Sequence, residues 1–151
     1  MTSIDFYFNA GTDADGKLAV ACRLAGKALQ QKKRLLIFAP QPERAQRVDR
    51  MLWTAQAVSF LPHCYAHDPL AARTPILIAT AEEPASSPAA ACEVLLNLGD
   101  ESPPLFERHA RLLEIVSQDE ADRQAGRARF AYYRDRGYQI RSHDLAAEGR
   151  A

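Results

Sequence analysis

The sequence predicts an α/β fold, in which helices cover both faces of a mainly parallel, mixed sheet to give three layers. Two observations predict it. Short, nearly uninterrupted apolar runs recur along the chain, and such runs are typical of strands that are covered on both faces. Between them lie segments whose apolar residues recur at every third or fourth position, which indicates amphipathic helices. Strands that alternate with helices build an α/β/α domain with right-handed crossovers.

Length and composition fit a single domain that spans residues 1–151, of which we expect the last few to be disordered. A chain of 151 residues can bury a core without metals or disulfides, and its 47% hydrophobic and 25% charged residues are close to the globular average. No apolar run approaches the roughly 20 residues of a membrane helix, and the N-terminus lacks the basic start of a secretory signal. We therefore expect a cytoplasmic protein without a membrane partner.

Three cysteines, Cys22, Cys64 and Cys92, are odd in number and have no CxxC spacing. Two of them lie within apolar segments. We expect free, largely buried thiols of a reducing compartment that carry no chemistry.

The first half of the chain predicts two strands and two helices. IDFYF at 4–8 is rich in aromatic and β-branched residues, and the turn-forming NAGTDADGK follows it. From Leu18 onward the apolar spacing of a helix continues to the basic QKKR, where cations suit the helix dipole. RLLIFAP at 34–40 then predicts a buried strand, and PERAQRVDRMLW predicts a second helix that begins at Pro42.

The second half repeats this alternation. PILIAT at 75–80 and VLLNLG at 94–99 predict buried strands, separated by AEEPASSPAAA, which we interpret as an exposed loop. PPLFERHA predicts a short helix and RLLEIVS at 111–117 a further strand. QDEADRQAGRARFAYYRDRG, acidic at its start and basic toward its end, predicts the longest helix, closed by Gly137.

The balanced charge of the chain excludes a strong electrostatic field over the whole protein surface. The 19 Lys and Arg residues balance 19 Asp and Glu residues, so any electrostatic partner must recognise a local patch, and direct binding of DNA is not expected. The densest local patch is RARFAYYRDRGY at 127–138, with four arginines and four aromatic residues.

On a helix, part of this patch forms one stripe, because its members stand four, three and four residues apart: Arg123, Arg127, Phe130 and Arg134. Arginine binds carboxylates in bidentate fashion and an aromatic ring can contact a ligand ring, so the stripe suits an acidic peptide with a terminal carboxylate. It would also suit a phosphate backbone. The alternative is a solvated face whose arginines are neutralised in the preceding turns by Asp119, Glu120 and Asp122.

A phosphate loop is the competing interpretation. GTDADGKL matches G-x-x-x-x-G-K through Gly11, Gly16 and Lys17, after a predicted strand and before a predicted helix. However, Leu18 provides no hydroxyl for magnesium, and two aspartates lie where a triphosphate would bind. A nucleotide-binding enzyme that uses this loop is therefore kept as the alternative function.

Other chemistry has weaker support. A zinc site is conceivable in the HCYAHD segment, yet such sites usually need better spacing and a fourth ligand, so a loop with some histidines is favoured. The acidic end of the 94–99 strand could hold a metal beside the phosphate loop, but strands of α/β domains commonly end in polar turn residues. The residues concerned are His63, Cys64, His67, Asp68, Asp100 and Glu101. No catalytic set and no cofactor site can be identified. Trp53 follows the core position Leu52 and points elsewhere, and Phe60 lies in a predicted loop, so both are either peripheral core or partner anchors.

The run KKRLLIFAPQPERAQRVDRMLW, the SFLPH that follows it and the closing RARFAYYRDRGYQI resemble the chi subunit family of bacterial DNA polymerase III. The likeness extends in order from the N-terminal FYF to the last strand. It implies a Rossmann-like topology without a functional nucleotide site, and a non-catalytic accessory of the clamp loader. It also implies two partners: the psi subunit, and the acidic, phenylalanine-terminated C-terminal tail of single-stranded DNA-binding protein.

The resemblance also assigns residues. Arg127 matches the key tail-binding arginine, Arg123 a supporting basic position and Phe130 an aromatic position, while Ser142 falls on the strand that lines the pocket. Where the family pattern has a lysine, this chain has Ala131, so either Arg134 compensates from the next turn or the tail binds more weakly.

Trp53 and Phe60 match the aromatic residues of the psi-binding surface, which a helicase partner uses in some bacteria. The resemblance therefore favours partner anchors over peripheral core at both positions.

Overall fold

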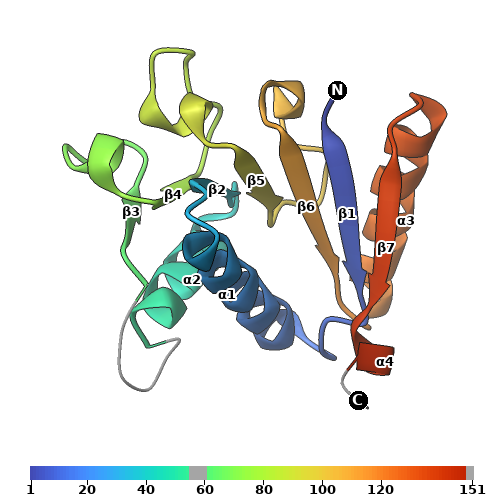
Figure 1. The fold of residues 1–151 in the computed structure, drawn as a ribbon. Coiled ribbons are helices and arrows are strands. Elements are labelled where there is room, and N and C mark those ends of the chain that lie inside the picture. The colour runs from blue at the N-terminus through green and yellow to red at the C-terminus, as the bar shows by residue number, and fades with distance from the viewer. Residues whose placement is uncertain (55–60, 149–151) are drawn as a thin grey trace.

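A computed structural model describes residues 1–54 and 61–148 and has seven strands in one sheet (Figure 1). The spatial order is β3-β4-β2-β5-β6-β1-β7, and each neighbouring pair is parallel. The predicted α/β class is confirmed, with a wholly parallel sheet. The strands are β1 (Ser3–Phe8), β2 (Leu35–Phe38), β3 (His63–Tyr65), β4 (Ile76–Ala79), β5 (Val94–Asn97), β6 (Arg111–Val116) and β7 (Ile140–Asp144).

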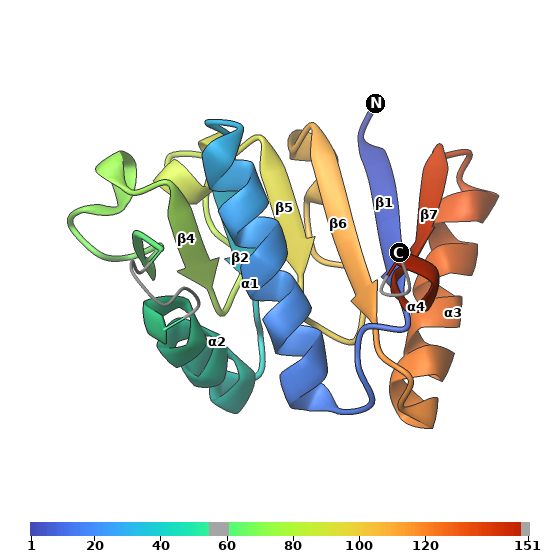
Figure 2. The same ribbon diagram turned by 60° about the horizontal axis from the view of Figure 1, so that its bottom comes forward.

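Helices lie on both faces of this sheet, as the apolar strand pattern predicts (Figures 1 and 2). One face packs against α1 (Ala14–Gln30) and α2 (Pro42–Thr54), and α3 (Glu120–Asp135) packs against the other face. The central strands β2, β4 and β5 contribute side chains to both cores, which explains their uninterrupted apolar runs. Short 3-10 turns complete the α3 side: η1 (Ala71–Arg73), η2 (Pro88–Ala91) and η3 (Phe106–Arg108).

The first helix begins earlier than its apolar pattern indicates. Asp13 is the N-cap, and its Oδ1 accepts a hydrogen bond from the Gly16 amide at 2.9 Å, so α1 starts at Ala14 within the segment predicted to be a turn. Gly11 has φ +76°, and a Cβ atom at Gly11 would lie 2.7 Å from the Gly16 Cα. These two glycines therefore let the loop pack directly against the first turn of the helix.

Two further predictions need correction. The HCYAHD segment was expected to be a loop, but His63–Tyr65 forms edge strand β3 beside β4. The AEEPASSPAAA segment is not wholly exposed, because η2 buries Ala89 and the adjacent Cys92 in the α3-side core. The short helix expected from PPLFERHA is present as η3.

All three cysteines are free thiols, as expected; Cys22 and Cys92 are buried, whereas Cys64 is half-buried. Burial raises the pKa of both buried thiols to about 11, so neither is a thiolate near neutral pH. Among the described residues, no helix is long and apolar enough to cross a membrane. The expected disorder at the C-terminus concerns residues 149–151, which lie outside the described ranges.

Candidate functional site

The arginine stripe lies on one flank of α3. The helix begins after Asp119, whose Oδ2 accepts a hydrogen bond from the Asp122 amide at 3.1 Å. Gly126, Arg129 and Tyr133 form its buried face. One side of that face presents what we call the arginine flank, which consists of Arg123, Arg127, Phe130 and Arg134.

The arginine flank faces the edge of the sheet at β7. The opposite flank of α3 carries Ala121 and Ala125, which line a cavity together with Asp100, beyond the end of β5. Because β5 and β7 lie on opposite sides of β6 and β1, the arginine flank must point outward, toward the free edge of β7. The three arginines are exposed there, and the side chain of Arg127 is 62% accessible to solvent.

Phe130 joins this flank to the sheet. Its ring contacts Phe6 edge-on with centroids 5.2 Å apart, and the ring of Phe8 lies 6.4 Å away, so Phe130 is only half-exposed. Ser142 is in register with Phe6 on the neighbouring strand, and register partners point to the same face of a sheet. The structure therefore brings Phe130 and Ser142 to the same side of the sheet, below the arginines.

Acidic neighbours neutralise the arginine flank only in part. Arg127 lies 3.8 Å from Glu120, and Arg134 lies 3.1 Å from its neighbour Asp135, but both pairs are exposed and such pairs contribute little. Asp119 caps the helix, and Asp122 is engaged elsewhere, as described below. Within residues 1–54 and 61–148, the Arg123 side chain has no ion pair. The flank thus keeps guanidinium groups available to an anion.

Beneath the flank, a buried ion pair attaches α3 to the sheet. Glu114 on β6 has no exposed surface, and its carboxylate accepts hydrogen bonds from Arg129 Nε at 2.9 Å, Tyr133 Oη at 2.6 Å and Asn97 Nδ2 at 3.1 Å. Burial raises the pKa of Glu114, while the Arg129 charge and the three donors oppose that rise. Arg129 Nη1 also donates to the Asp100 carbonyl at 2.9 Å. This pair fixes the rotation of α3, and with it the direction of the arginine flank.

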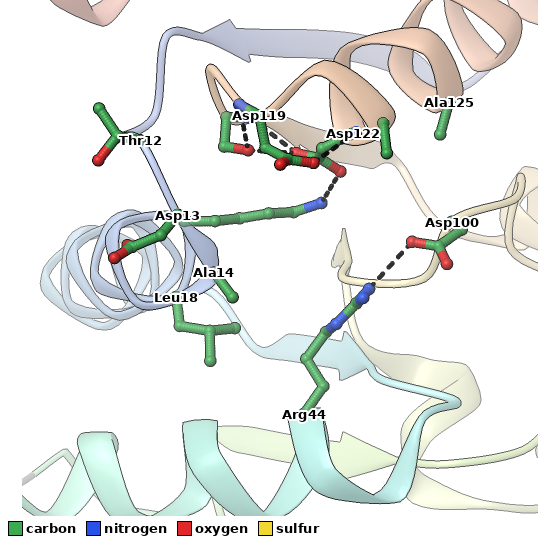
Figure 3. Close-up of a pocket in the computed structure, with 12 residues that line it drawn as sticks. Thr12, Asp13, Ala14, Leu18, Arg44, Asp100, Asp119, Asp122 and Ala125 are labelled. Carbon is green, nitrogen blue, oxygen red and sulfur yellow. Dashed lines mark hydrogen bonds and ion pairs between the residues drawn. The ribbon is translucent and has the colours of Figure 1, made fainter.

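A second candidate site is the cavity of about 480 Å³ at the carboxyl ends of the strands. It lies between the first turns of α1 and α3, where the phosphate-loop alternative places its ligand, and four aspartates surround it: Asp13, Asp100, Asp119 and Asp122 (Figure 3). The two cations of the cavity are already paired. Lys17 Nζ lies 2.8 Å from Asp122, and Arg44 lies 3.2 Å from Asp100 and also donates to the Leu98 carbonyl.

Asp122 binds the lysine that a bound phosphate would need. Its carboxylate accepts hydrogen bonds from Lys17, from the Ser117 amide at 2.8 Å and from the Ser117 hydroxyl at 2.9 Å. Burial alone would raise the pKa of Asp122, but Lys17 and the Ser117 donors outweigh burial and hold the pKa below its ordinary value. The lysine of the phosphate-loop motif is therefore an internal ion-pair partner, and Gly11 and Gly16 serve the packing described above.

Comparison with known proteins identifies the family. The family model for "DNA polymerase III chi subunit, HolC" matches residues 1–141. The chain belongs to the DNA polymerase III chi subunit family. Relatives named DNA polymerase III subunit chi include one from Pseudomonas aeruginosa, 32% identical over 96% of this chain and 98% of the relative. Another, from Escherichia coli, is 27% identical over 93% of this chain and 96% of the relative. The resemblance seen in the sequence is thus confirmed.

A solved structure shares the fold of this chi family chain. The C-terminal domain of the DEAD-box protein Dbp5 superposes with a TM-score of 0.63, covering 96% of this chain and 92% of that chain, at 14% identity. At this identity the likeness concerns the fold alone. It agrees with the Rossmann-like topology expected from the resemblance.

The second predicted surface of this chi family chain is described in part. Trp53, at the end of α2, is 53% exposed, and its ring contacts the His63 ring edge-on at 5.1 Å. Its neighbour Leu52 is fully buried, as the helical pattern predicts. Phe60, assigned to the same surface, lies outside the described residues.

The HCYAHD segment and the acidic strand end show no metal centre among the described residues. His63 instead bridges the Leu61 carbonyl at 2.6 Å and Asp49 at 2.9 Å, and so connects β3 to α2. These two contacts account for the position of His63 without a metal ligand role.

Sequence patterns missed the buried role of Arg129 and Tyr133, which the helical spacing puts on a stripe next to the arginine flank. One signal was available. Glu114 interrupts the apolar run RLLEIV, and a carboxylate in a covered strand requires a buried donor from the packing helix. A search for that donor in the following helix would lead to Arg129.

Proposed function

We propose that this chi family protein is a non-catalytic adaptor of the DNA polymerase III holoenzyme. In this proposal it binds the acidic C-terminal tail of single-stranded DNA-binding protein through Arg123, Arg127, Phe130, Arg134 and Ser142. It joins the clamp loader through the psi subunit, at the surface that includes Trp53 and Phe60, and a helicase competes with psi there in organisms that have one.

The observation that carries the proposal is the arginine flank above the sheet edge. The exposed guanidinium groups are suited to bidentate bonds with carboxylates, and Phe130, backed by Phe6 and Phe8, offers an apolar contact beside them. An acidic peptide that ends in a phenylalanine with a free carboxylate would use both features together. A purely solvated face would not require an aromatic ring at this position.

The separation of the two surfaces supports an adaptor. Trp53 is on α2, which covers the β3–β4 end of the sheet, whereas the arginine flank lies on α3, on the opposite face and at the β7 end (Figures 1 and 2). Two partners can therefore bind at the same time without overlapping.

The test is a calorimetric titration with an acidic peptide that ends in phenylalanine, beside the same peptide without that residue. We expect micromolar affinity that weakens with salt and is lost without the phenylalanine. Arg127→Ala should reduce the free energy of binding by about 1–3 kcal/mol, the scale of a lost charge-assisted hydrogen bond, and leave psi binding unchanged.

Arg50→Ala is the matched control, because Arg50 is an exposed arginine on α2, far from the flank. An equal loss of psi binding in Arg127→Ala would contradict the two-surface model. Binding of neither peptide by the wild-type protein would contradict tail recognition.

A further inference from the structure

Part of one sheet face carries no long helix. On the side of α1 and α2, the two helices together cover the sheet from β3 to β6, and among the described residues only the single turn α4 (Leu145–Glu148) lies over β1 and β7 there (Figure 2). The side chains on this open part are polar or aromatic: Ser3, Asp5 and Tyr7 on β1, Arg111 at the start of β6, and Arg141 and His143 on β7.

Asp5 organises this surface. Its carboxylate is only 1% exposed, and it accepts hydrogen bonds from Arg111 Nη2 at 2.9 Å and from His143 Nε2 at 2.9 Å. Arg141 contacts both carboxylate oxygens, through Nε at 3.1 Å and Nη2 at 3.3 Å. The ring of His143 stacks on that of Tyr7 with centroids 4.6 Å apart, which fixes the imidazole.

The cluster carries a net positive charge. One carboxylate is shared by two guanidinium groups, and Asp5 is the sole acidic residue that the described β1, β6 and β7 strands place on this part of the face. The Arg141 side chain is 58% exposed and that of Arg111 is 36% exposed. Each guanidinium has five N–H donors, so each has donors left for an incoming anion, and Asp5 holds both groups in place before binding. We call these two residues the Arg111–Arg141 pair.

The Arg111–Arg141 pair and the arginine flank lie on opposite faces of the sheet, at the end that β7 closes. Arg141 and Ser142 are consecutive on β7, so their side chains point to opposite faces, Ser142 toward the arginine flank and Arg141 toward the open face. Strand β7 is at the edge of the sheet, and in the part of the chain that the structure describes no further strand pairs with its outer side. An extended peptide advances about 3.3 Å per residue, so a segment of four to six residues spans roughly 13–20 Å.

We propose that an acidic peptide bound at the arginine flank continues around the edge of β7, and that its upstream acidic side chains bind the Arg111–Arg141 pair on the open face of the sheet. The proposal rests on the proposed function, because it extends the same peptide from one face of β7 to the other. Charge complementarity favours an acidic segment on this surface over an apolar or basic one.

The test compares two peptides by calorimetry with the full-length protein. The long peptide ends in phenylalanine and has acidic residues along about ten positions, whereas the short peptide keeps only about the last four residues. Arg141→Ala should weaken the binding of the long peptide about threefold to tenfold, since one partly exposed charge contact is removed. The binding of the short peptide should not change. Arg127→Ala should weaken the binding of both peptides, and Arg50→Ala should change the binding of neither.

Asp5 loses one partner in Arg141→Ala, so a thermal melt must show that the variant is folded. Arg111→Gln is the second variant, and it should also weaken only the long peptide. Replacing the upstream acidic residues of the peptide with amides should remove the effect of Arg141→Ala, as expected for a direct contact.

Each other outcome overturns the inference in a distinguishable way. If Arg141→Ala has no effect on either peptide while Arg127→Ala weakens both, the tail site stands and its extension does not. If Arg141→Ala weakens the short peptide equally, Arg141 acts through the fold. If Arg141→Ala weakens the binding of a single-stranded oligonucleotide instead of the long peptide, the surface binds nucleic acid. Failure of both peptides with the wild-type protein overturns the proposed function and the inference together.

Discussion

Replacing Arg129 by alanine tests whether the buried pair beneath the arginine flank holds α3 in place. The change removes the Nε donor from Glu114, which has no exposed surface, and the Nη1 donor from the Asp100 carbonyl. Breaking a buried pair by removing one partner typically costs about 3–5 kcal/mol. Tyr133 and Asn97 still donate to Glu114, so we expect a loss in the free energy of unfolding near the lower end of that range, about 3 kcal/mol.

The loss should depend on pH, because the orphaned carboxylate can take up a proton. Burial already raises the pKa of Glu114, and removing the Arg129 charge raises it further. A carboxyl group whose pKa is higher in the folded state than in the unfolded state destabilises the fold as pH rises above the unfolded value of about 4.3. The difference between wild type and Arg129→Ala should therefore be smaller at pH 5 than at pH 8.

Urea unfolding followed by circular dichroism at both pH values measures this difference. In thermal melts, a loss of about 3 kcal/mol corresponds to a fall in Tm of roughly 6–12 °C for a chain of this size. Arg136→Ala is the control, since Arg136 is an exposed arginine at the C-cap of the same helix and its replacement should cost less than 1 kcal/mol. A loss in Arg129→Ala below 1 kcal/mol, or one equal at pH 5 and pH 8, would refute the reasoning.

Three further predictions follow from other contacts. Lys17→Met should lower the free energy of unfolding by about 3 kcal/mol in urea unfolding, because the largely buried Asp122 loses its cation and keeps only the Ser117 donors. Because Lys17 is already paired, titration of the wild-type protein with magnesium ATP should show no binding. Gly126→Ala should cost about 1–3 kcal/mol in urea unfolding, because its Cβ would lie 2.6 Å from Val116 Cγ2. Burial would raise the pKa of Asp5, but hydrogen bonds from His143 and Arg111 and the charges of the arginines lower it. The ionised Asp5 therefore stabilises the fold above pH 4 and progressively less as pH falls. Asp5→Asn should remove that part of the acid unfolding transition.

The layered fold could be predicted because the central covered strands are almost wholly apolar. The runs at β2, β4 and β5 lie between two cores, so every side chain except Asn97, at the end of β5, is apolar. The edge strands β3 and β7 are harder to predict from the sequence, since their segments HCY and IRSHD are short and half-exposed. Their pairing with β4 and β1 depends on neighbours that are distant in sequence.

The candidate site also has a part that the sequence predicts and a part that it does not. The arginine flank depends on spacing within one helix, so its members could be predicted to share a stripe. The cluster around Asp5 joins residues more than 100 positions apart, and so does the pair of Lys17 and Asp122, whereas Glu114 and Arg129 are 15 positions apart but belong to a strand and a helix on its face. Such pairs depend on strand order, which one sequence alone does not provide.

The position of β1 in the sheet has a consequence for synthesis on the ribosome. Strand β1 is made first but pairs only with β6 and β7, so Ser3 meets Arg111 and Ile4 meets Ile140. Its buried side chains Ile4 and Phe6 therefore have no sheet partner until most of the chain has emerged. Because contacts of such long sequence separation form late and expose apolar surface meanwhile, the nascent N-terminus is the segment that we expect to need protection from aggregation.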